Sequence, residues 1–138
     1  MNPKILKAMV ISLVVITVGG VVALILVLNS STQASDEPTI DELREYSIET
    51  DELTTDLQND RFVRIQFRIV TDSKDAKEEL EKRDFQLKNI LIKQLSPMNE
   101  EEFKSGVESL EGTLKTRLNE LMTEGVVTEV YTIKKVLQ

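Results

Sequence analysis

Two pairs of carboxylates are the first candidates for chemistry in this sequence. Asp72 and Asp75 are three residues apart, and so are Glu78 and Glu81, which places each pair on one face of a helix. Such a pair could serve as general acid and base if burial shifted one of its pKa values. The hydrophobic pattern, however, puts all four at solvent-facing positions, where this spacing is common. We therefore predict no catalytic residues.

The residue types that most enzymes need are absent from the sequence. The 138 residues include no Cys, His or Trp, which removes the thiolate, the side chain most used for proton transfer near neutral pH and the commonest transition-metal ligand. Beyond the first 28 residues the only glycines are Gly106, Gly112 and Gly125, so no phosphate-binding loop or Gly-x-Gly-x-x-Gly pattern occurs. We predict neither an enzyme nor a bound cofactor or metal.

A strand positions a second set of candidate residues. The segment from Arg61 to Thr71 alternates between an apolar side, made of Val63, Ile65, Phe67 and Ile69, and a polar side, made of Arg64, Gln66 and Arg68. This is the pattern of a half-buried strand, which we expect at the centre of the core. The polar row is a candidate subunit interface, because arginine is enriched at interfaces. A solvated strand face has the same composition, and the sequence leaves both interpretations open.

The stretch from Ala8 to Leu28 has no charge, and seventeen of its twenty-one residues are apolar. A helix of this length reaches about 30 Å, the thickness of the hydrocarbon core of a bilayer. Lys4 and Lys7 precede it, and no Lys or Arg follows it before Arg44, which predicts a cytoplasmic N-terminus and an extracytoplasmic remainder. A cleavable signal peptide is the rival interpretation, although its apolar region is usually shorter.

One pair within this apolar stretch has the spacing of a helix–helix contact. Gly19 and Ala23 are four residues apart, and small residues at this spacing let two membrane helices approach closely. Ordinary tolerance of glycine in membrane helices is the alternative.

Charge and composition then divide the rest of the chain. The segment from Ser35 to Asp60 has ten acidic residues and one basic residue, whereas the remainder, from Arg61 onward, has fourteen of each. Without a clustered basic face we predict no binding of nucleic acid. We expect a cytoplasmic N-terminus at residues 1–7, a transmembrane helix at 8–28, a flexible acidic linker at 29–42 and an extracytoplasmic domain at 43–138, with one or two short extended segments near its start.

The domain should be of the α+β class, with antiparallel strands packed against two main helices. We expect one helix from Lys74 to Leu95, capped by Asp72 or Ser73, with its weakest turn at Glu81–Asp84. A short helix should follow at Asn99–Ser105, with Phe103 as its anchor. A second long helix should start at Val107 and end at Gly125 as a left-handed cap. The final strand should span Val126–Leu137, with Tyr131 and Ile133 pointing inward and a bulge or strand end near Lys134.

The order of these segments resembles the FliL family of flagellar basal-body-associated membrane proteins. The stretches that carry the resemblance are Phe62–Ile69, Leu87–Ile92, Leu114–Glu120 and Val126–Tyr131, followed by an apolar strand and Gln138. The resemblance covers essentially the whole chain, through hydrophobic patterns and not through catalytic signatures.

The resemblance implies a single-pass protein of the cell membrane with a stomatin-like extracytoplasmic domain. It further implies a ring of copies of the chain around the flagellar stator, which aids rotation, swimming and swarming. The implied partners are the chain itself, the linker of the peptidoglycan-binding stator subunit, the membrane ring of the rotor and the lipid bilayer. The alternative from the residues is a membrane-anchored sensor or regulator with an extracytoplasmic ligand-binding domain.

Overall fold

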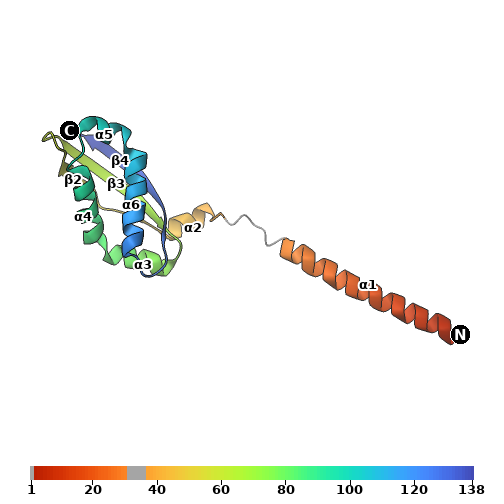
Figure 1. Ribbon diagram of the computed structural model, residues 1–138. Coiled ribbons are helices and arrows are strands. Elements are labelled where there is room, and N and C mark those ends of the chain that lie inside the picture. Colours follow the sequence, from red (N-terminus) through yellow and green to blue (C-terminus); the bar gives the residue numbers. More distant parts are fainter. Residues whose placement is uncertain (1, 31–36) are drawn as a thin grey trace. The chain divides into compact units, whose positions relative to one another are not determined.

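The computed structural model of the chain describes residues 2–30 and 37–138. The chain divides into two compact units, one ending at Pro38 and the other extending from Thr39 to Gln138. Figure 1 shows the first unit as a single helix and the second as a sheet with several helices. Each unit is described by itself. Residues 31–36 of the flexible linker expected at 29–42 lie outside the described part of the chain.

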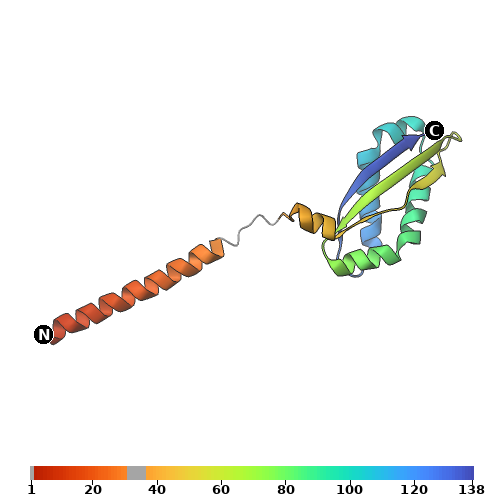
Figure 2. The ribbon, with the colours of Figure 1, turned by 180° about the vertical axis from the view of Figure 1, so that it is seen from behind.

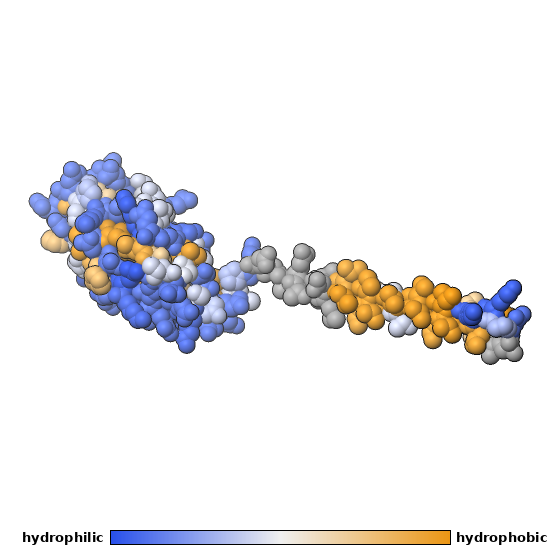
Figure 3. Space-filling view, turned by 60° about the horizontal axis from the view of Figure 1, so that its bottom comes forward, coloured by the Kyte–Doolittle hydropathy of each residue, from blue (hydrophilic) through white to orange (hydrophobic). Residues whose placement is uncertain are grey.

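The first unit is helix α1, which spans Pro3–Ser30. Proline suits the first position of a helix, because the amide hydrogen it lacks would have no helical partner there. The segment Pro3–Val27 is long and apolar enough to cross a membrane by length and composition, and its side chains are exposed. Figure 3 shows it as an almost continuous hydrophobic surface. The helix is therefore longer at both ends than the uncharged stretch at residues 8–28.

The second unit is built around one four-stranded antiparallel sheet. Its elements are α2 (Ile40–Glu45), β1 (Ser47–Glu49), β2 (Leu53–Asp56), β3 (Phe62–Thr71), α3 (Lys74–Lys82), α4 (Asp84–Leu95), α5 (Glu100–Ser105), α6 (Val107–Leu121) and β4 (Val127–Leu137). Strand β3 is central, because β1 and β2 pair with one of its edges and β4 pairs with the other. The predicted α+β class, with an antiparallel sheet and an N-terminal apolar helix, is confirmed.

The core lies between one face of the sheet and the long helices. The four residues of β3 that the alternation predicts to point inward are all fully buried: Val63, Ile65, Phe67 and Ile69. Leucines of α4 and α6 complete the cluster, among them Leu87, Leu91, Leu114 and Leu118. Figure 1 shows α4 and α6 in front of the sheet, and Figure 2, from behind, shows the sheet in front of them. Most of the second sheet face is therefore free of helices.

The helix expected from Lys74 to Leu95 is two helices, so the prediction of one continuous helix was wrong. Ser73 caps α3 by accepting a hydrogen bond from the amide of Ala76 at 3.2 Å. Arg83 ends α3 and begins α4 with φ −96° and ψ 17°, outside helical geometry. The break falls in the charged turn predicted to be the weakest, where no buried side chain holds the backbone straight.

Helix α2 occupies positions that the sequence pattern assigned to the linker. It starts at Ile40, within the expected linker at 29–42, and precedes the short extended segments expected near the start of the domain, which are β1 and β2. A capping box starts it, because Thr39 accepts from the amide of Glu42 while the Glu42 carboxylate accepts from the amide of Thr39 at 2.8 Å. The folded unit therefore begins immediately after Pro38.

The residues of β4 that face the core are not the ones expected from the sequence. Tyr131 and Ile133 are 46% and 45% exposed, so the prediction that both point inward was wrong. The register of β4 against β3 shifts twice, and each shift adds one residue to β4. The residues opposite the buried side of β3 are therefore unevenly spaced: Val127, Val130, Thr132, Lys135 and Leu137. The second shift lies at Ile133, next to Lys134, where a bulge was expected.

Side chains of α6 cover part of the outer edge of β4. Asn119 bonds the backbone of Val127 twice, accepting from its amide at 2.7 Å and donating to its carbonyl at 3.0 Å. Glu111 accepts from the amide of Thr132 at 2.7 Å. These contacts satisfy backbone groups that a neighbouring strand would otherwise bond.

The predicted short helix is confirmed as α5, with a capping box at Asn99 and with Phe103 buried in the core. Gly125 has the expected positive φ, 74°, but α6 ends at Leu121, so Gly125 is not its cap. Gly125 instead turns the chain into β4 beside the start of α3, where a Cβ atom would lie 2.3 Å from an oxygen of Asp72.

Candidate partner-binding surfaces

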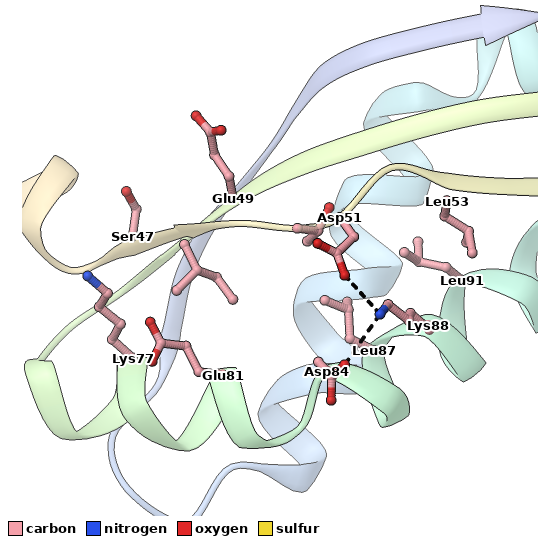
Figure 4. A pocket seen from close by; sticks show the side chains of 12 residues that line it. Ser47, Glu49, Asp51, Leu53, Lys77, Glu81, Asp84, Leu87, Lys88 and Leu91 are labelled. Atoms are coloured by element: carbon pink, nitrogen blue, oxygen red, sulfur yellow. Dashed lines mark hydrogen bonds and ion pairs between the residues drawn. The ribbon is translucent and has the colours of Figure 1, made fainter.

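One hollow of the folded unit is a groove of about 360 Å³ between the β1–β2 segment and helices α3 and α4. Figure 4 shows the strand segment along one side and the helices along the other. Apolar side chains line its interior: Ile48, Leu53, Leu87 and Leu91. Charged side chains surround them: Glu49, Asp51, Lys77, Glu81, Asp84 and Lys88. The groove combines an apolar interior with a polar rim, as binding sites commonly do.

Ion pairs cross this groove between the β1–β2 segment and α4. The Lys88 ammonium lies 3.0 Å from Oδ2 of Asp51 and 3.3 Å from Oδ2 of Asp84 (Figure 4). The hydrogen bond to Asp51, followed by that to Asp84, raises the pKa of Lys88. Lys77 donates to the carbonyl of Glu45 at 2.9 Å. In the described part of the chain, the Glu81 carboxylate makes neither an ion pair nor a hydrogen bond.

The predicted interface row of Arg64, Gln66 and Arg68 lies on the sheet face opposite the helices. Both arginines already have carboxylate partners in the same chain: Arg64 lies 3.7 Å from Glu52, and Arg68 pairs with Glu49. Arg68 also donates to the hydroxyl of Ser47 at 2.9 Å, and Gln66 donates to the carbonyl of Thr50 at 2.9 Å. The charge of this row is therefore largely balanced within the sheet.

Apolar side chains are exposed on the same sheet face. Val136 and Tyr131 lie opposite Arg64 and Arg68 in the register, and Phe62 begins β3 with 54% of its surface exposed. A hydrogen bond from Lys134 is the main cause of a lowered pKa of Glu52, so a third cation is also neutralised there. Because the charges are already paired and apolar groups lie beside them, covering this surface with a partner costs little desolvation free energy.

The small residues Gly19 and Ala23 both lie on α1, one turn apart, and both are exposed. A Cβ atom added to Gly19 would meet nothing within 4 Å. Their role in a helix–helix contact stays a prediction.

The four carboxylates considered for acid–base chemistry are not brought together. Asp72 accepts from the amide of Val126 at 3.0 Å, and Glu78 lies 4.0 Å from Lys74. Asp75 is exposed at the start of α3, and Glu81 lies at the groove. Within residues 2–30 and 37–138, no group of acidic side chains is arranged to hold a metal ion.

The most perturbed carboxylate is Glu79, which the sequence pattern did not single out. Desolvation alone would raise its pKa, but the amide of Glu124, the Arg83 guanidinium and the amide and hydroxyl of Thr123 outweigh that effect and lower the pKa to about 2. These groups lie at 2.6–3.0 Å from the carboxylate oxygens. Arg83 is one helical turn away in sequence and could have been found, but Thr123 is 44 residues away. The arrangement fixes the α6–β4 loop on α3.

Comparison with known proteins defines the class. The family described as "Flagellar basal body-associated protein FliL" matches residues 47–138. The chain is 35% identical over 114 residues to "Flagellar protein FliL" of Bacillus subtilis (strain 168), covering 81% of each chain. These matches place it among the structural and accessory proteins of the flagellum. Within that class, the chain belongs to the FliL family, since the match covers all the strands and long helices of the folded unit.

Proposed function

We propose that this protein is a non-enzymatic accessory of the flagellar motor, held in the cytoplasmic membrane by α1. The observation that carries this proposal is the family match over residues 47–138, joined to one helix long and apolar enough to span a bilayer. Lys4 and Lys7 lie at the start of that helix, before its uncharged stretch at residues 8–28, which supports a cytoplasmic N-terminus and an extracytoplasmic domain. In this position the domain supports the stator and aids rotation, swimming and swarming.

The domains of several copies form a ring around the stator in this proposal. Its partners are the chain itself, the linker of the peptidoglycan-binding stator subunit and the membrane ring of the rotor. The subunit interface includes Arg64, Gln66 and Arg68, supported by the exposed apolar side chains beside them. In the membrane, Gly19 and Ala23 provide a face on which a second helix can pack closely.

Deletion of the gene tests the motor function. We expect slower swimming and a larger loss of swarming on viscous medium, both restored by the full-length gene. A version without residues 2–30 should not restore either one, because the domain would no longer be held at the membrane. Wild-type swimming and swarming in the deletion strain would contradict the proposed motor function.

The interface is tested by reversing charge on the sheet face. Full-length protein with Arg64→Glu and Arg68→Glu should form smaller assemblies in detergent, as measured by analytical ultracentrifugation. A variant with Lys74→Glu and Arg117→Glu, which reverses two exposed charges on the helical side, is the matched control and should assemble like the wild type. Equal assembly of both variants would place the interface elsewhere.

A further inference from the structure

The outer edge of β1 has unpaired backbone groups. Tyr46 accepts from the amide of Thr71 and Thr50 donates to the carbonyl of Phe67, so both residues direct their backbone groups toward β3. Alternation along the strand gives Ile48 the same direction and turns the amide and carbonyl of Glu49 the other way. In the described sheet β1 has one neighbour, β3, and no strand lies on its other side.

This open edge forms one wall of the groove described above. The groove is lined by β1 on one side and by α3 and α4 on the other, and its interior is apolar. Figure 4 shows Lys77 and Glu81 rising from α3 toward the β1 segment. An edge strand facing a helix across an apolar groove is the geometry in which an extended peptide adds to a sheet, with backbone bonds to the strand and alternate side chains in the groove.

The charges of the rim favour a basic occupant. Three carboxylates, Asp51, Glu81 and Asp84, face the groove against two lysines, while the Glu49 carboxylate points to the other sheet face and pairs with Arg68. Lys88 is neutralised by its two aspartates, and the Lys77 ammonium is engaged by the carbonyl of Glu45. Glu81 is left with no partner at the rim, at a position where a cation on the occupant would meet it.

We propose that an extended segment of a partner protein, with alternating apolar and basic side chains, binds in this groove by adding as a strand to β1. Its apolar side chains contact Ile48, Leu53 and Leu91, and a lysine or arginine pairs with Glu81. This goes beyond the proposed function, because it assigns a second binding surface, separate from the sheet face with the arginine row, and does not depend on ring formation.

Binding is measured with the full-length protein in lipid nanodiscs. The probe is an acetylated, amidated and fluorescently labelled heptapeptide of alternating valine and lysine, and its counterpart has glutamate in place of lysine. We expect saturable binding of the lysine peptide in fluorescence anisotropy and much weaker binding of the glutamate peptide. Methyl NMR signals of Ile48, Leu53, Leu87 and Leu91 should shift during the titration, which would locate the peptide in the groove.

Two substitutions distinguish the contribution of charge to peptide binding from that of backbone pairing with β1. Glu81→Lys should weaken binding about fivefold or more, whereas Glu78→Lys, the same change on the same helix outside the groove, should not. Glu49→Pro removes the outward amide without removing a bond to β3, and should weaken binding by roughly fivefold relative to Glu49→Ala, which keeps the amide. Far-UV circular dichroism checks that each variant is folded.

Three results would overturn the proposal. They are equal affinity for the lysine and glutamate peptides, equal affinity of Glu49→Pro and Glu49→Ala, and methyl shifts confined to residues outside the groove. Because none of these measurements uses motility, a normal deletion strain would contradict the motor function and leave the groove proposal standing, and the reverse also holds.

Discussion

Two threonines allow the contribution of a single hydroxyl to the stability of this domain to be measured. The Thr132 hydroxyl is buried with no hydrogen-bond partner in the described chain, whereas the Thr71 hydroxyl donates to the carbonyl of Tyr46 at 2.7 Å. We expect Thr132→Val to raise the free energy of unfolding by about 1 kcal/mol and Thr71→Val to lower it by about 1 kcal/mol. Urea unfolding of residues 39–138 measures both.

The two variants are each other's control, since they make the same change in size and polarity. Changes of the same sign would show that loss of the hydroxyl acts through the unfolded chain or through packing, and not through the hydrogen bond.

Glu79 gives the domain a stability that depends on pH. Its pKa is lowered from the ordinary 4.5 to about 2, so the folded state holds this proton less tightly than the unfolded state does. The stabilisation is therefore fully present above about pH 4.5 and is lost as the pH falls toward about 2. We expect Glu79→Gln to be less stable than the wild type at pH 7, with a difference that shrinks between pH 4.5 and pH 2.

Urea unfolding at several pH values measures this difference. Glu78→Gln, on the exposed side of the same helix, should unfold like the wild type across the range. A gap between Glu79→Gln and the wild type that stays constant down to pH 2 would contradict the assignment of the stabilisation to this carboxylate.

At the scale of elements, two glycines should respond to substitution in opposite ways. Gly125 has a positive φ, and a Cβ atom there would collide with Asp72 and come within 2.9 Å of Ala76, so Gly125→Ala should lower the free energy of unfolding by about 2 kcal/mol. Gly112 lies on α6 with open space around it, and Gly112→Ala should raise that free energy by about 0.5–1 kcal/mol. Thermal unfolding distinguishes the two, and a neutral Gly125→Ala would contradict the tight turn.

The central strand could be predicted from sequence because its signal is local. From Val63 to Ile69 each inward residue of β3 is apolar and each residue between is polar, so this stretch predicts both the strand and its buried side. The side that each residue of β4 faces, in contrast, could not be predicted from its sequence. Two bulges change which residues face the core, and a bulge depends on pairing with β3, which the sequence of β4 alone does not encode.

The sites were less predictable than the elements. The groove joins β1 to α3 and α4, which lie 25 residues or more further along the chain, and its lining includes residues on both sides of the break at Arg83. The pattern indicated a weak turn near Arg83, whose contacts with Glu79 and Gln86 are local in sequence. The contacts of Glu79 with Thr123 and Glu124 needed the folded chain.

For the whole molecule, the absence of cysteine makes topology directly measurable. A cysteine introduced by Gln138→Cys should react with a membrane-impermeant maleimide in intact cells, and one introduced by Asn2→Cys should react only after lysis. This expectation follows from the proposed orientation, because basic residues such as Lys4 and Lys7 before an apolar span favour a cytoplasmic N-terminus. The changes Lys4→Glu and Lys7→Glu together should reduce labelling at position 138.

Labelling of Asn2→Cys in intact cells would contradict this orientation. Loss of position 2 from the mature protein, detected by mass spectrometry, would instead identify the apolar segment as a cleaved signal peptide.

The two edges of the sheet also set a limit on how chains can associate. Asn119 and Glu111 occupy backbone groups on the outer edge of β4, at Val127 and Thr132, while the edge of β1 at Glu49 stays open. A sheet that grows into a fibre needs an accessible edge on both sides, so that each added chain becomes the template for the next. A strand that pairs with the first part of β4 would have to displace Asn119 and Glu111, which opposes polymerisation of the domain through its sheet.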